Sequence, residues 1–360
     1  MKVYFDEQAF TLQSRGGVSR YFVELMKAFR SDGSYRIEVT TPRLWSANEH
    51  LIDAGMGRRL PDPPSHRKEV HRAANLLLRG AGIPDLVHHT YYARGYLRQH
   101  RARARVVTVY DMIPELFPKL FPRGNPHLDK RKYVARADLI VCISEATRKD
   151  LVDIYGTPSA RTVVTPLGVD PEFQPGATRP PGLPDRYVLF VGDRVGYKDF
   201  VVLAKAFAAT SDPHVHLVAV GGGAWRDVER ALLERLGIAA RSHQRTLSDA
   251  DLAGAYANAL CFVFPSRYEG FGLPTLEAMA CGCPTILVHS SSHPEVGGSA
   301  ALYFPPEDDA ELTRLLDRVV GDDARRDQLA SAGLAQARTF GWDRTARLTA
   351  DAYVSLVGGL

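Results

Sequence analysis

Short apolar runs alternate with helical stretches along most of the 360-residue chain. Runs this short that are apolar on both faces are typical of parallel strands covered by helices on either side of the sheet. Between two such runs, helical spacing marks one apolar stripe formed by Val18, Tyr21, Phe22, Leu25, Met26 and Phe29. The predicted strands are residues 2–5, 37–40, 86–88, 106–110, 139–143, 162–164, 187–191, 216–220, 260–264, 285–287 and 301–304. Strand followed by helix, repeated, predicts a doubly wound α/β fold.

One segment interrupts this alternation. Residues 168–185 contain five prolines and three glycines without periodicity, which is typical of a linker. We therefore expect two Rossmann-like domains, residues 1–170 and 186–341, joined by a linker at 171–185, with a C-terminal helix at 342–360 completing the first domain. Two domains of similar size imply a cleft between them, where ligands commonly bind.

The composition excludes several classes of protein. The chain is 45% hydrophobic and 24% charged, which is close to soluble globular averages and excludes a disordered, collagen-like or coiled-coil chain. The formal net charge of +4 is too small to indicate nucleic acid as a partner. No apolar run approaches the roughly 20 residues of a membrane span, and the N-terminus lacks the apolar core of a secretion signal. We expect a cytoplasmic protein that does not cross a membrane.

The four cysteines indicate neither a metal nor a disulfide. Cys142 and Cys261 lie in apolar runs, whereas Cys281 and Cys283 flank one glycine without the histidines or second pair that a zinc site needs. We expect four buried thiols in a reducing compartment.

The segment from Phe264 to Pro284 carries the most informative chemistry. A strand ends at Phe264, a loop with Gly270 and Gly272 follows, and a helix begins near Pro274. The glycines allow backbone N–H groups to approach a ligand closely, and the helix N-terminus attracts anions. The pattern therefore predicts a binding loop for a diphosphate.

Two carboxylates flank this loop, Glu269 within it and Glu277 about one turn into the helix. A carboxylate beside a phosphate is repulsive unless it has another task, and accepting hydrogen bonds from sugar hydroxyls is such a task. The alternative is that Glu277 caps its own helix and that Glu269 is a solvated charge. The spacing alone leaves both interpretations open.

Seven residues separate Glu269 from Glu277, within the sequence SRYEGFGLPTLEAMACGCP. This run resembles the E-x7-E signature of retaining glycosyltransferase family 4, in its mannosyltransferase-like group. The resemblance covers nearly the whole chain and includes residues 16–21, 109–114, 143–144, 166–170, 192–198 and 300–305. It implies the GT-B fold, in which two Rossmann-like doubly wound parallel-sheet domains face a central cleft.

The resemblance implies a role for each residue of the donor loop. Glu277 would bind the ribose hydroxyls of a nucleotide sugar, and Glu269 would face hydroxyls of the donor sugar. Gly221 and Leu247 would lie near the base. The diphosphate would lie against the backbone of Gly270, Phe271, Gly272, Leu273 and Pro274.

The resemblance also assigns a cationic pair, Arg194 and Lys198, to the diphosphate. The leaving nucleoside diphosphate gains charge as the glycosidic bond breaks, and fixed cations stabilise that charge. Ordinary surface charge in a loop is the alternative. From the first domain, Gly16 and Gly17 form a glycine pair at a helix N-terminus, which the resemblance places over the donor phosphates and the acceptor.

On the acceptor side the chain departs from the family pattern. Many relatives carry histidine before Asp111, whereas this chain has Tyr110. Because a tyrosine with an ordinary pKa of about 10 is a poor base near neutral pH, Asp111 is the better candidate for contacting the acceptor or positioning the sugar. His88 and His89, at the end of a predicted strand, are further acceptor-side candidates, with a purely structural role as the alternative.

Catalysis is assigned to Asp111, Arg194, Lys198 and Glu269. No second carboxylate is identified as a nucleophile of the kind that retaining glycosidases use. The resemblance instead implies attack on the same face through an ion pair, with the leaving diphosphate helping to remove the acceptor proton. No cofactor or metal is expected, and the GDP- or UDP-linked hexose is a substrate.

Residues 58–105 are rich in arginine, and residues 65–79 fit a basic amphipathic helix. Such a face is expected to meet anionic lipid at the inner side of the cell membrane, with a solvated helix face as the alternative. The expected function is transfer of a hexose to a glycan or lipid-linked glycan in surface polysaccharide biosynthesis. The donor is expected to be GDP-mannose, which supplies mannose, or else a UDP-hexose. A sugar-nucleotide epimerase of the same fold and a basic lipid- or nucleic-acid-binding module are the alternatives.

Overall fold

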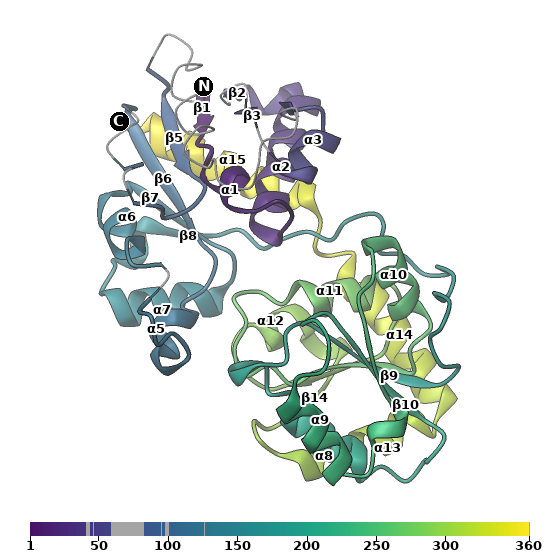
Figure 1. The fold of residues 1–360 in the computed structure, drawn as a ribbon. Helices are drawn as coiled ribbons and strands as arrows, with labels where there is room; N and C mark the ends of the chain where they lie inside the picture. The colour runs from purple at the N-terminus through teal and green to yellow at the C-terminus, as the bar shows by residue number, and fades with distance from the viewer. Residues whose placement is uncertain are drawn as a thin grey trace. The chain divides into compact units, whose positions relative to one another are not determined.

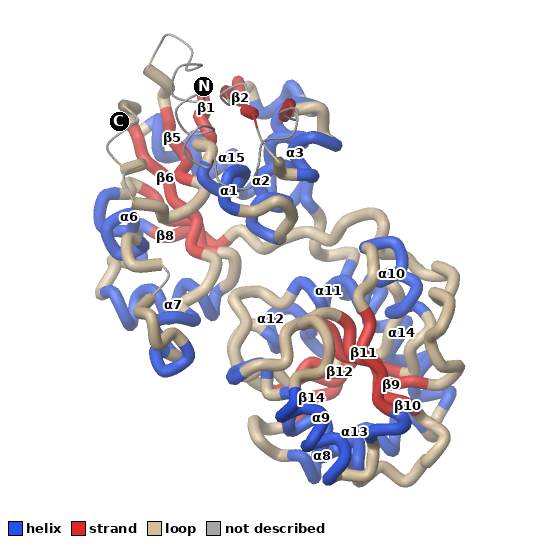
Figure 2. Tube along the Cα trace, viewed as in Figure 1, coloured by secondary structure: helices blue, strands red, loops and turns tan. Residues whose placement is uncertain are grey.

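A computed structural model describes residues 1–40, 44–45, 47–58, 83–94, 96–97, 101–125 and 127–359 (Figure 1). The chain divides into two compact units, one formed by Met1–Gly168 with Trp342–Leu360 and the other by Val169–Gly341. Each unit contains a six-stranded parallel sheet flanked by helices, which confirms the predicted doubly wound α/β class (Figure 2).

The sheet of the first unit has the strand order β2-β1-β5-β6-β7-β8. Its strands are β1 (Lys2–Phe5), β2 (Glu38–Thr40), β5 (Leu86–His89), β6 (Ala104–Val109), β7 (Leu139–Cys142) and β8 (Thr162–Val164). A separate two-stranded sheet pairs β3 (Leu44–Trp45) with β4 (Gly57–Arg58). The helices are α1 (Gln8–Leu12), α2 (Gly17–Ser31), α3 (Glu49–Asp53), α5 (Ile113–Leu116), α6 (Lys130–Arg136), α7 (Glu145–Tyr155) and α15 (Trp342–Gly358).

Helix α15 belongs to the first unit although it ends the chain, and it lies against α2 (Figure 1). The apolar stripe predicted for residues 18–29 accounts for this packing, because Tyr21, Leu25 and Phe29 of α2 are buried. Thr345 anchors the start of α15 by donating a hydrogen bond of 2.6 Å to the carbonyl oxygen of Pro166.

The sheet of the second unit has the strand order β11-β10-β9-β12-β13-β14. Its strands are β9 (Tyr187–Val191), β10 (His216–Val220), β11 (Ser242–Arg245), β12 (Cys261–Phe264), β13 (Thr285–Val288) and β14 (Leu302–Phe304). Its helices are α8 (Phe200–Ala208), α9 (Asp227–Arg235), α10 (Asp249–Ala257), α11 (Leu273–Ala280), α12 (His293–Gly297), α13 (Asp309–Val320) and α14 (Asp323–Ala337).

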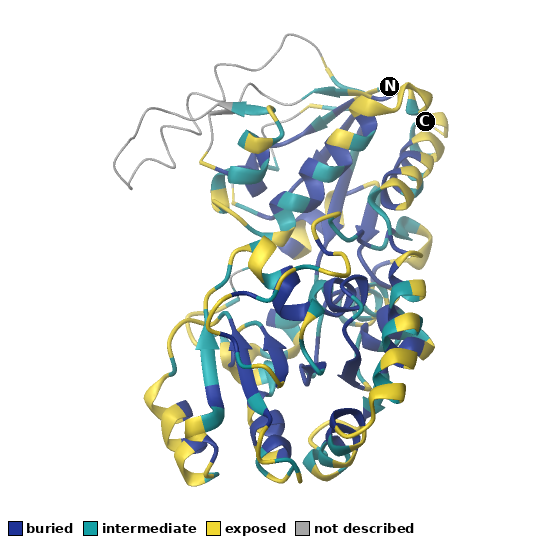
Figure 3. Cartoon of the chain, turned by 90° about the vertical axis from the view of Figure 1, so that its right-hand side faces the viewer, coloured by how far each residue is buried: buried dark blue, intermediate teal, exposed yellow. Residues whose placement is uncertain are grey.

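Burial of the strands explains why the sequence signals them so clearly. Every residue of β9, β12 and β13 is buried, and these strands form the centre of the second unit (Figure 3). Phe190 packs edge-on against Phe200 of α8, with ring centroids 5.3 Å apart. Burial of such side chains stabilises the unit by about 1.5–3 kcal/mol each.

Strand β11 was not predicted. Its sequence, Ser-His-Gln-Arg, has no apolar run, and it lies at the sheet edge, where it pairs only with β10. The short strands β3 and β4 were not predicted either. All of the predicted strands are present, with ends that differ by up to two residues.

Residues 171–185, expected to form a linker, are grouped with the second unit. Its contacts with the unit include two hydrogen bonds: Asn258 donates to the carbonyl oxygen of Ala177 at 2.9 Å, and Arg245 donates to that of Gly182 at 2.9 Å. The predicted basic helix at residues 65–79 lies outside the described residues. Within the described part of the chain, each helix is too short or too polar to cross a bilayer.

The strand orders mark two places where ligands bind in open α/β sheets. In the second unit the order reverses between β9 and β12, and in the first between β1 and β5. Loops leaving the carboxyl ends of such neighbouring strands diverge to opposite faces of the sheet, which opens a crevice at that edge.

Candidate active site

The predicted donor-site residues of the second unit all lie at the carboxyl edge of its sheet. Lys198 follows β9, Gly221 follows β10, Leu247 follows β11, and Glu269 follows β12. The strands are parallel, so their carboxyl ends share one edge. Gly221 has a positive φ of 90°, and Leu247 is half-buried.

Lys198 and Glu269 meet at the reversal between β9 and β12. The Lys198 ammonium lies 2.6 Å from a carboxylate oxygen of Glu269, although the two residues are 71 positions apart in the chain. The same ammonium lies over the rings of Tyr197 and Phe264, at 5.3 and 5.4 Å from their centroids. With its side chain only 12% exposed, Glu269 is not the solvated charge that the alternative interpretation required.

Three consecutive serines hold the loop that carries Glu269. Ser290 donates to the carbonyl oxygen of Arg267, and Ser291 donates to that of Glu269, each at 2.7 Å. Ser292 donates to the carbonyl oxygen of Phe271, also at 2.7 Å. The loop backbone is therefore fixed from the neighbouring β13–α12 connection. These serines were not predicted from the sequence, although a run of three after a predicted strand was the available signal.

Helix α11 begins directly behind this loop. Gly272 has a φ of 102°, a left-handed conformation that favours glycine, and Pro274 occupies the first turn. A side chain at Gly272 would place its Cβ 3.7 Å from Thr275 Oγ1 and 3.9 Å from His293 Nδ1. Both of these polar atoms are buried and have no hydrogen-bond partner among the described residues. Buried polar atoms need partners, and the N-terminus of α11 attracts anions, so this arrangement fits a phosphate.

Glu277 lies one turn further along α11 and is 9% exposed. It does not cap its own helix, because α11 has Gly272 as its N-cap and no side-chain cap. Instead it accepts a hydrogen bond of 3.3 Å from the Tyr256 hydroxyl. Burial, reinforced by the Glu277 charge, raises the pKa of Tyr256 well above its usual value, so this hydroxyl remains a donor.

Arg194 does not have the expected geometry of a phosphate-binding cation. Its side chain is 1% exposed, and its guanidinium donates to the Glu229 carboxylate at 3.2 and 3.3 Å. It also stacks over Trp225, 4.7 Å from the ring centroid. Further bonds go to the carbonyl oxygens of Gly221, Gly222, Gly223 and Ala224. Because all of these partners are internal, Arg194 shapes the glycine loop after β10, and the role assigned to it from the sequence is corrected.

Glu229 of α9 compensates this buried charge. Burial would raise the pKa of Glu229, but hydrogen bonds from Arg226 and Arg194 outweigh burial and lower the pKa below its ordinary value. The carboxylate therefore stays ionised beside Arg194.

In the first unit, Gly16 and Gly17 lie at the start of α2, as expected. Gly16 is the N-cap, with extended backbone, and Gly17 is the first helical residue. The Gln13 side chain already occupies part of this terminus, because its Oε1 atom accepts from the Ser19 amide at 3.3 Å. An anion at this position would have to share or displace Gln13.

The structure gives His88 a structural role. It is fully buried, with Nδ1 2.5 Å from the Tyr353 hydroxyl and Nε2 2.8 Å from Thr108 Oγ1. Burial lowers its pKa to about 3. His88 thus holds α15 to the sheet and is not an acceptor-side group.

His89 lies at the reversal between β1 and β5. Its Nδ1 atom is 2.7 Å from a carboxylate oxygen of Asp6, and both side chains are buried. Asp6 also accepts from the Thr90 amide at 2.9 Å and from Gln8 at 2.6 Å. His89 therefore belongs to a buried polar network that connects the two central strands.

Tyr110 and Asp111 follow β6, but only Asp111 faces solvent in part. Tyr110 is buried and donates its hydroxyl to the carbonyl oxygen of Thr90 at 2.7 Å, so that hydroxyl is not available to an acceptor. Burial raises its pKa well above the ordinary value. Asp111 accepts from the Ile113 amide at 2.9 Å, while its carbonyl oxygen accepts from Lys130 at 2.8 Å.

Lys130 is a buried residue that the sequence analysis did not identify. Its ammonium donates to Glu115 at 2.8 Å and has no exposed side-chain surface. A charge this deep is retained only when it is paired. The Glu115–Lys130 pair therefore fixes α5 and α6 on either side of Asp111.

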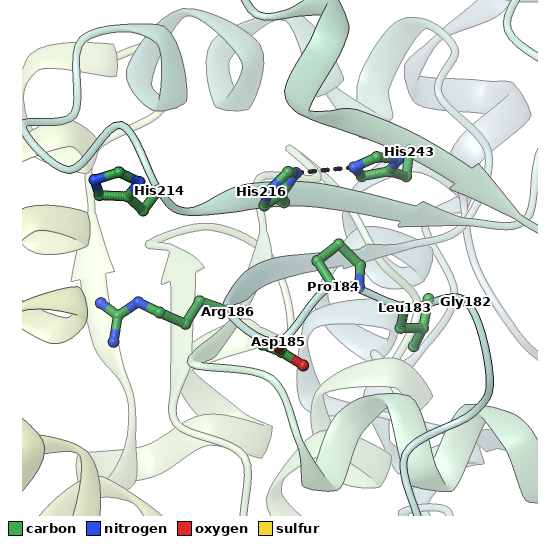
Figure 4. Close-up of a pocket in the computed structure, with 8 residues that line it drawn as sticks. All are labelled: Gly182, Leu183, Pro184, Asp185, Arg186, His214, His216 and His243. Carbon is green, nitrogen blue, oxygen red and sulfur yellow. Dashed lines mark hydrogen bonds between the residues drawn. The ribbon is translucent and has the colours of Figure 1, made fainter.

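A cavity of about 560 Å³ lies elsewhere in the second unit (Figure 4). It is formed at the amino ends of β9, β10 and β11, away from the carboxyl edge that carries the predicted donor residues. His216 and His243 face each other there with ring nitrogens 2.9 Å apart. The cavity is therefore separate from the donor site.

Two family models match the chain. The model described as "Glycosyltransferase Family 4" matches residues 15–173, and the model "Glycosyl transferases group 1" matches residues 179–336. The chain belongs to glycosyltransferase family 4.

Relatives of this glycosyltransferase include the O-antigen chain mannosyltransferase B of Escherichia coli. The two are 28% identical over 308 residues, which cover 79% of each protein. The serotype-specific mannosyltransferase WbdA of Escherichia coli is 29% identical over 273 residues. This match covers 70% of this chain and 33% of WbdA, which is a longer protein. Among solved structures, Anabaena HepE in complex with UDP and glucose has a TM-score of 0.75 at 19% identity, with 99% of this chain and 100% of HepE covered. The match to HepE confirms the GT-B fold.

Proposed function

We propose that this glycosyltransferase transfers a hexose from a nucleotide sugar, with retention of configuration, to a glycan or lipid-linked glycan. The observation that supports this most is the meeting of Lys198 and Glu269 at the β9–β12 reversal, directly before the N-terminus of α11. A cation and a helix N-terminus suit a diphosphate, and the two glutamates suit hydroxyl groups. Few ligands other than a nucleotide sugar carry both features.

In the proposed reaction the bond between the anomeric carbon and the phosphate oxygen breaks, and its electron pair stays on the diphosphate. Lys198 and the amides at the start of α11 stabilise the charge that develops there. Glu277 accepts from the ribose hydroxyls and Glu269 from the donor sugar. The acceptor oxygen attacks from the same face, and its proton passes to the leaving diphosphate. In this scheme Lys198 supplies the positive charge at the diphosphate, so we propose that no metal is needed.

We place mannose from GDP-mannose first among the donors and a UDP-hexose second. The mannosyltransferase relatives support the first, and the UDP and glucose bound by HepE are the reason to test the second. The relative named for O-antigen chains supports a surface polysaccharide as the product. A cytoplasmic location, with peripheral contact to anionic lipid at the inner face of the membrane, is part of the same proposal.

The proposal is tested by incubating the protein with GDP-mannose, UDP-glucose and UDP-galactose and measuring the free nucleoside diphosphate. We expect one donor to be consumed and its diphosphate to raise the melting temperature, because a ligand stabilises the state that binds it. Glu277→Gln should reduce that shift, and Glu234→Gln, an exposed change on α9, should preserve it. Conversion of a donor to its epimer without diphosphate release would favour the epimerase instead.

A further inference from the structure

Three tyrosines stack at the carboxyl ends of β5 and β6, beside Asp111. The rings of Tyr91 and Tyr92 are stacked with centroids 5.1 Å apart, and Tyr91 lies nearly parallel to Tyr110 at 6.4 Å. Tyr92 and Tyr110 are buried, and both donate their hydroxyls to backbone carbonyls, of Thr108 and Thr90. Tyr91 differs, because it is half-buried and its hydroxyl bonds to a side chain.

That side chain is His127, whose Nε2 atom lies 2.8 Å from the Tyr91 hydroxyl. The two rings meet edge to face, with centroids 5.5 Å apart. Burial lowers the pKa of His127, and the Asp111 charge opposes this only in part. Burial, with Asp111, raises the pKa of Tyr91 to about 12. Near neutral pH the contact therefore joins a neutral imidazole to a protonated phenol.

A chain of hydrogen bonds fixes His127 beside Asp111. The His127 amide donates to Asn125 Oδ1 at 2.7 Å, and the Asn125 side chain donates to Glu115 at 3.0 Å. Glu115 accepts from Lys130 at 2.8 Å, and Lys130 in turn donates to the carbonyl oxygen of Asp111 at 2.8 Å. The imidazole and Asp111 are thus parts of one rigid network.

A purely structural role leaves one feature of His127 unexplained. Its Nδ1 atom is buried and has no hydrogen-bond partner among the described residues. An unsatisfied buried polar group costs about 1–3 kcal/mol, which a structural contact to Tyr91 does not justify, since phenylalanine and leucine would pack there without this cost. The polar pair is better explained by a ligand that contacts the half-buried Tyr91, whose hydroxyl His127 orients.

We propose that Tyr91, His127 and Asp111 form the subsite that binds the acceptor sugar. The exposed part of the Tyr91 ring packs against a pyranose face, and its hydroxyl and the Asp111 carboxylate bind adjacent sugar hydroxyls. His127 is a positioning residue that orients the Tyr91 hydroxyl. His127 lies in the loop before α6 and supplies the imidazole that is absent at position 110. The role of this subsite in catalysis rests on the proposed glycosyl transfer, whereas sugar binding at the subsite does not.

The test uses Tyr91→Phe, His127→Leu and the double variant, with His127→Gln as a conservative replacement and Tyr35→Phe as a matched control in the same unit. The donor is the one that the test of the proposed function identifies, and the acceptors are methyl α-mannoside, methyl α-glucoside and methyl α-galactoside. Each single variant should raise the acceptor KM about tenfold. Release of diphosphate to water should change less than twofold. His127→Gln should recover part of the loss, and the double variant should be no worse than the worse single variant.

A second measurement does not depend on turnover. Saturation-transfer NMR with the three methyl glycosides, without donor, should detect binding to the parent and to Tyr35→Phe, and a much weaker signal with Tyr91→Phe and His127→Leu. If no donor is consumed but this pattern holds, the proposed reaction fails and the sugar subsite stands. No signal from the parent, or equal signals from the variants, overturns the subsite.

Discussion

The ion pair between Lys198 and Glu269 joins the loops that leave β9 and β12. In this state each charge satisfies the other, with the side chains 16% and 12% exposed. In the proposed site, a bound diphosphate would offer Lys198 a second anionic partner and would leave Glu269 free to accept from sugar hydroxyls. Without a donor, the ion pair therefore compensates both charges.

Lys198→Ala removes the cation that the proposed mechanism places at the diphosphate. We expect kcat to fall about 10²–10³-fold, the usual magnitude for loss of one group that stabilises the transition state. Steady-state diphosphate release measures this effect. Lys205→Ala, an exposed change on α8, is the control and should keep parental rates. Equal activity in both variants would exclude Lys198 from catalysis.

The Tyr256 hydroxyl orients the Glu277 carboxylate, so Tyr256→Phe should weaken donor binding less than Glu277→Gln does. We expect the donor KM to rise about tenfold for Glu277→Gln and two- to threefold for Tyr256→Phe, because in the proposed site Glu277 contacts the donor and the Tyr256 hydroxyl acts only through Glu277. Donor titrations at saturating acceptor measure both values. A larger rise in the donor KM for Tyr256→Phe than for Glu277→Gln would contradict the assigned geometry.

Arg194 should prove important for stability. Arg194→Met leaves the Glu229 carboxylate buried without its partner, and breaking a buried ion pair in this way costs about 3–5 kcal/mol. Denaturant unfolding followed in the second unit measures the loss, and Arg194→Met combined with Glu229→Gln should recover part of it. If Arg194 instead served the diphosphate, Arg194→Met would keep parental stability and lose only activity.

His88 makes the stability of the first unit depend on pH. Its folded pKa of about 3 lies below the unfolded value of about 6.5, so the unfolded state binds the proton first. The stabilising contribution of neutral His88 is complete above pH 6.5 and is lost as pH falls from 6.5 towards 3, by up to about 1.4 kcal/mol per pH unit. The difference between parent and His88→Gln in urea midpoints across this window measures it. The same slope in both proteins would refute the prediction, and His214→Gln controls for an exposed histidine.

Chelation of divalent metals should leave turnover unchanged, since in the proposed mechanism Lys198 and the start of α11 supply the positive charge at the diphosphate. Initial rates with and without EDTA check this expectation. A rate that falls with EDTA and returns with Mg²⁺ would show that the diphosphate is held through a metal.

Hydrophobic patterning was sufficient to predict most of the two sheets, because a central parallel strand is buried on both faces and must be apolar on both. It failed for the two-residue strands β3 and β4. It also failed for β11, where the polar residues Ser242 to Arg245 become a strand only by pairing with β10. The E-x7-E run was equally visible, since Glu269, the glycine loop and Glu277 are contiguous in the chain.

Contacts between distant segments decided the rest. The sequence identified Arg194 and Lys198 as equivalent cations, but Glu229, 35 residues from Arg194, turns one of them inward, and Glu269 holds the other at the strand reversal. Likewise, His127 had no recognisable motif, and it became significant only beside Tyr91. Local hydrophobic patterning indicates which strands are buried, whereas the charge and hydrogen-bonding partners of a side chain depend on which strands lie next to each other. That order is set by packing of the whole sheet.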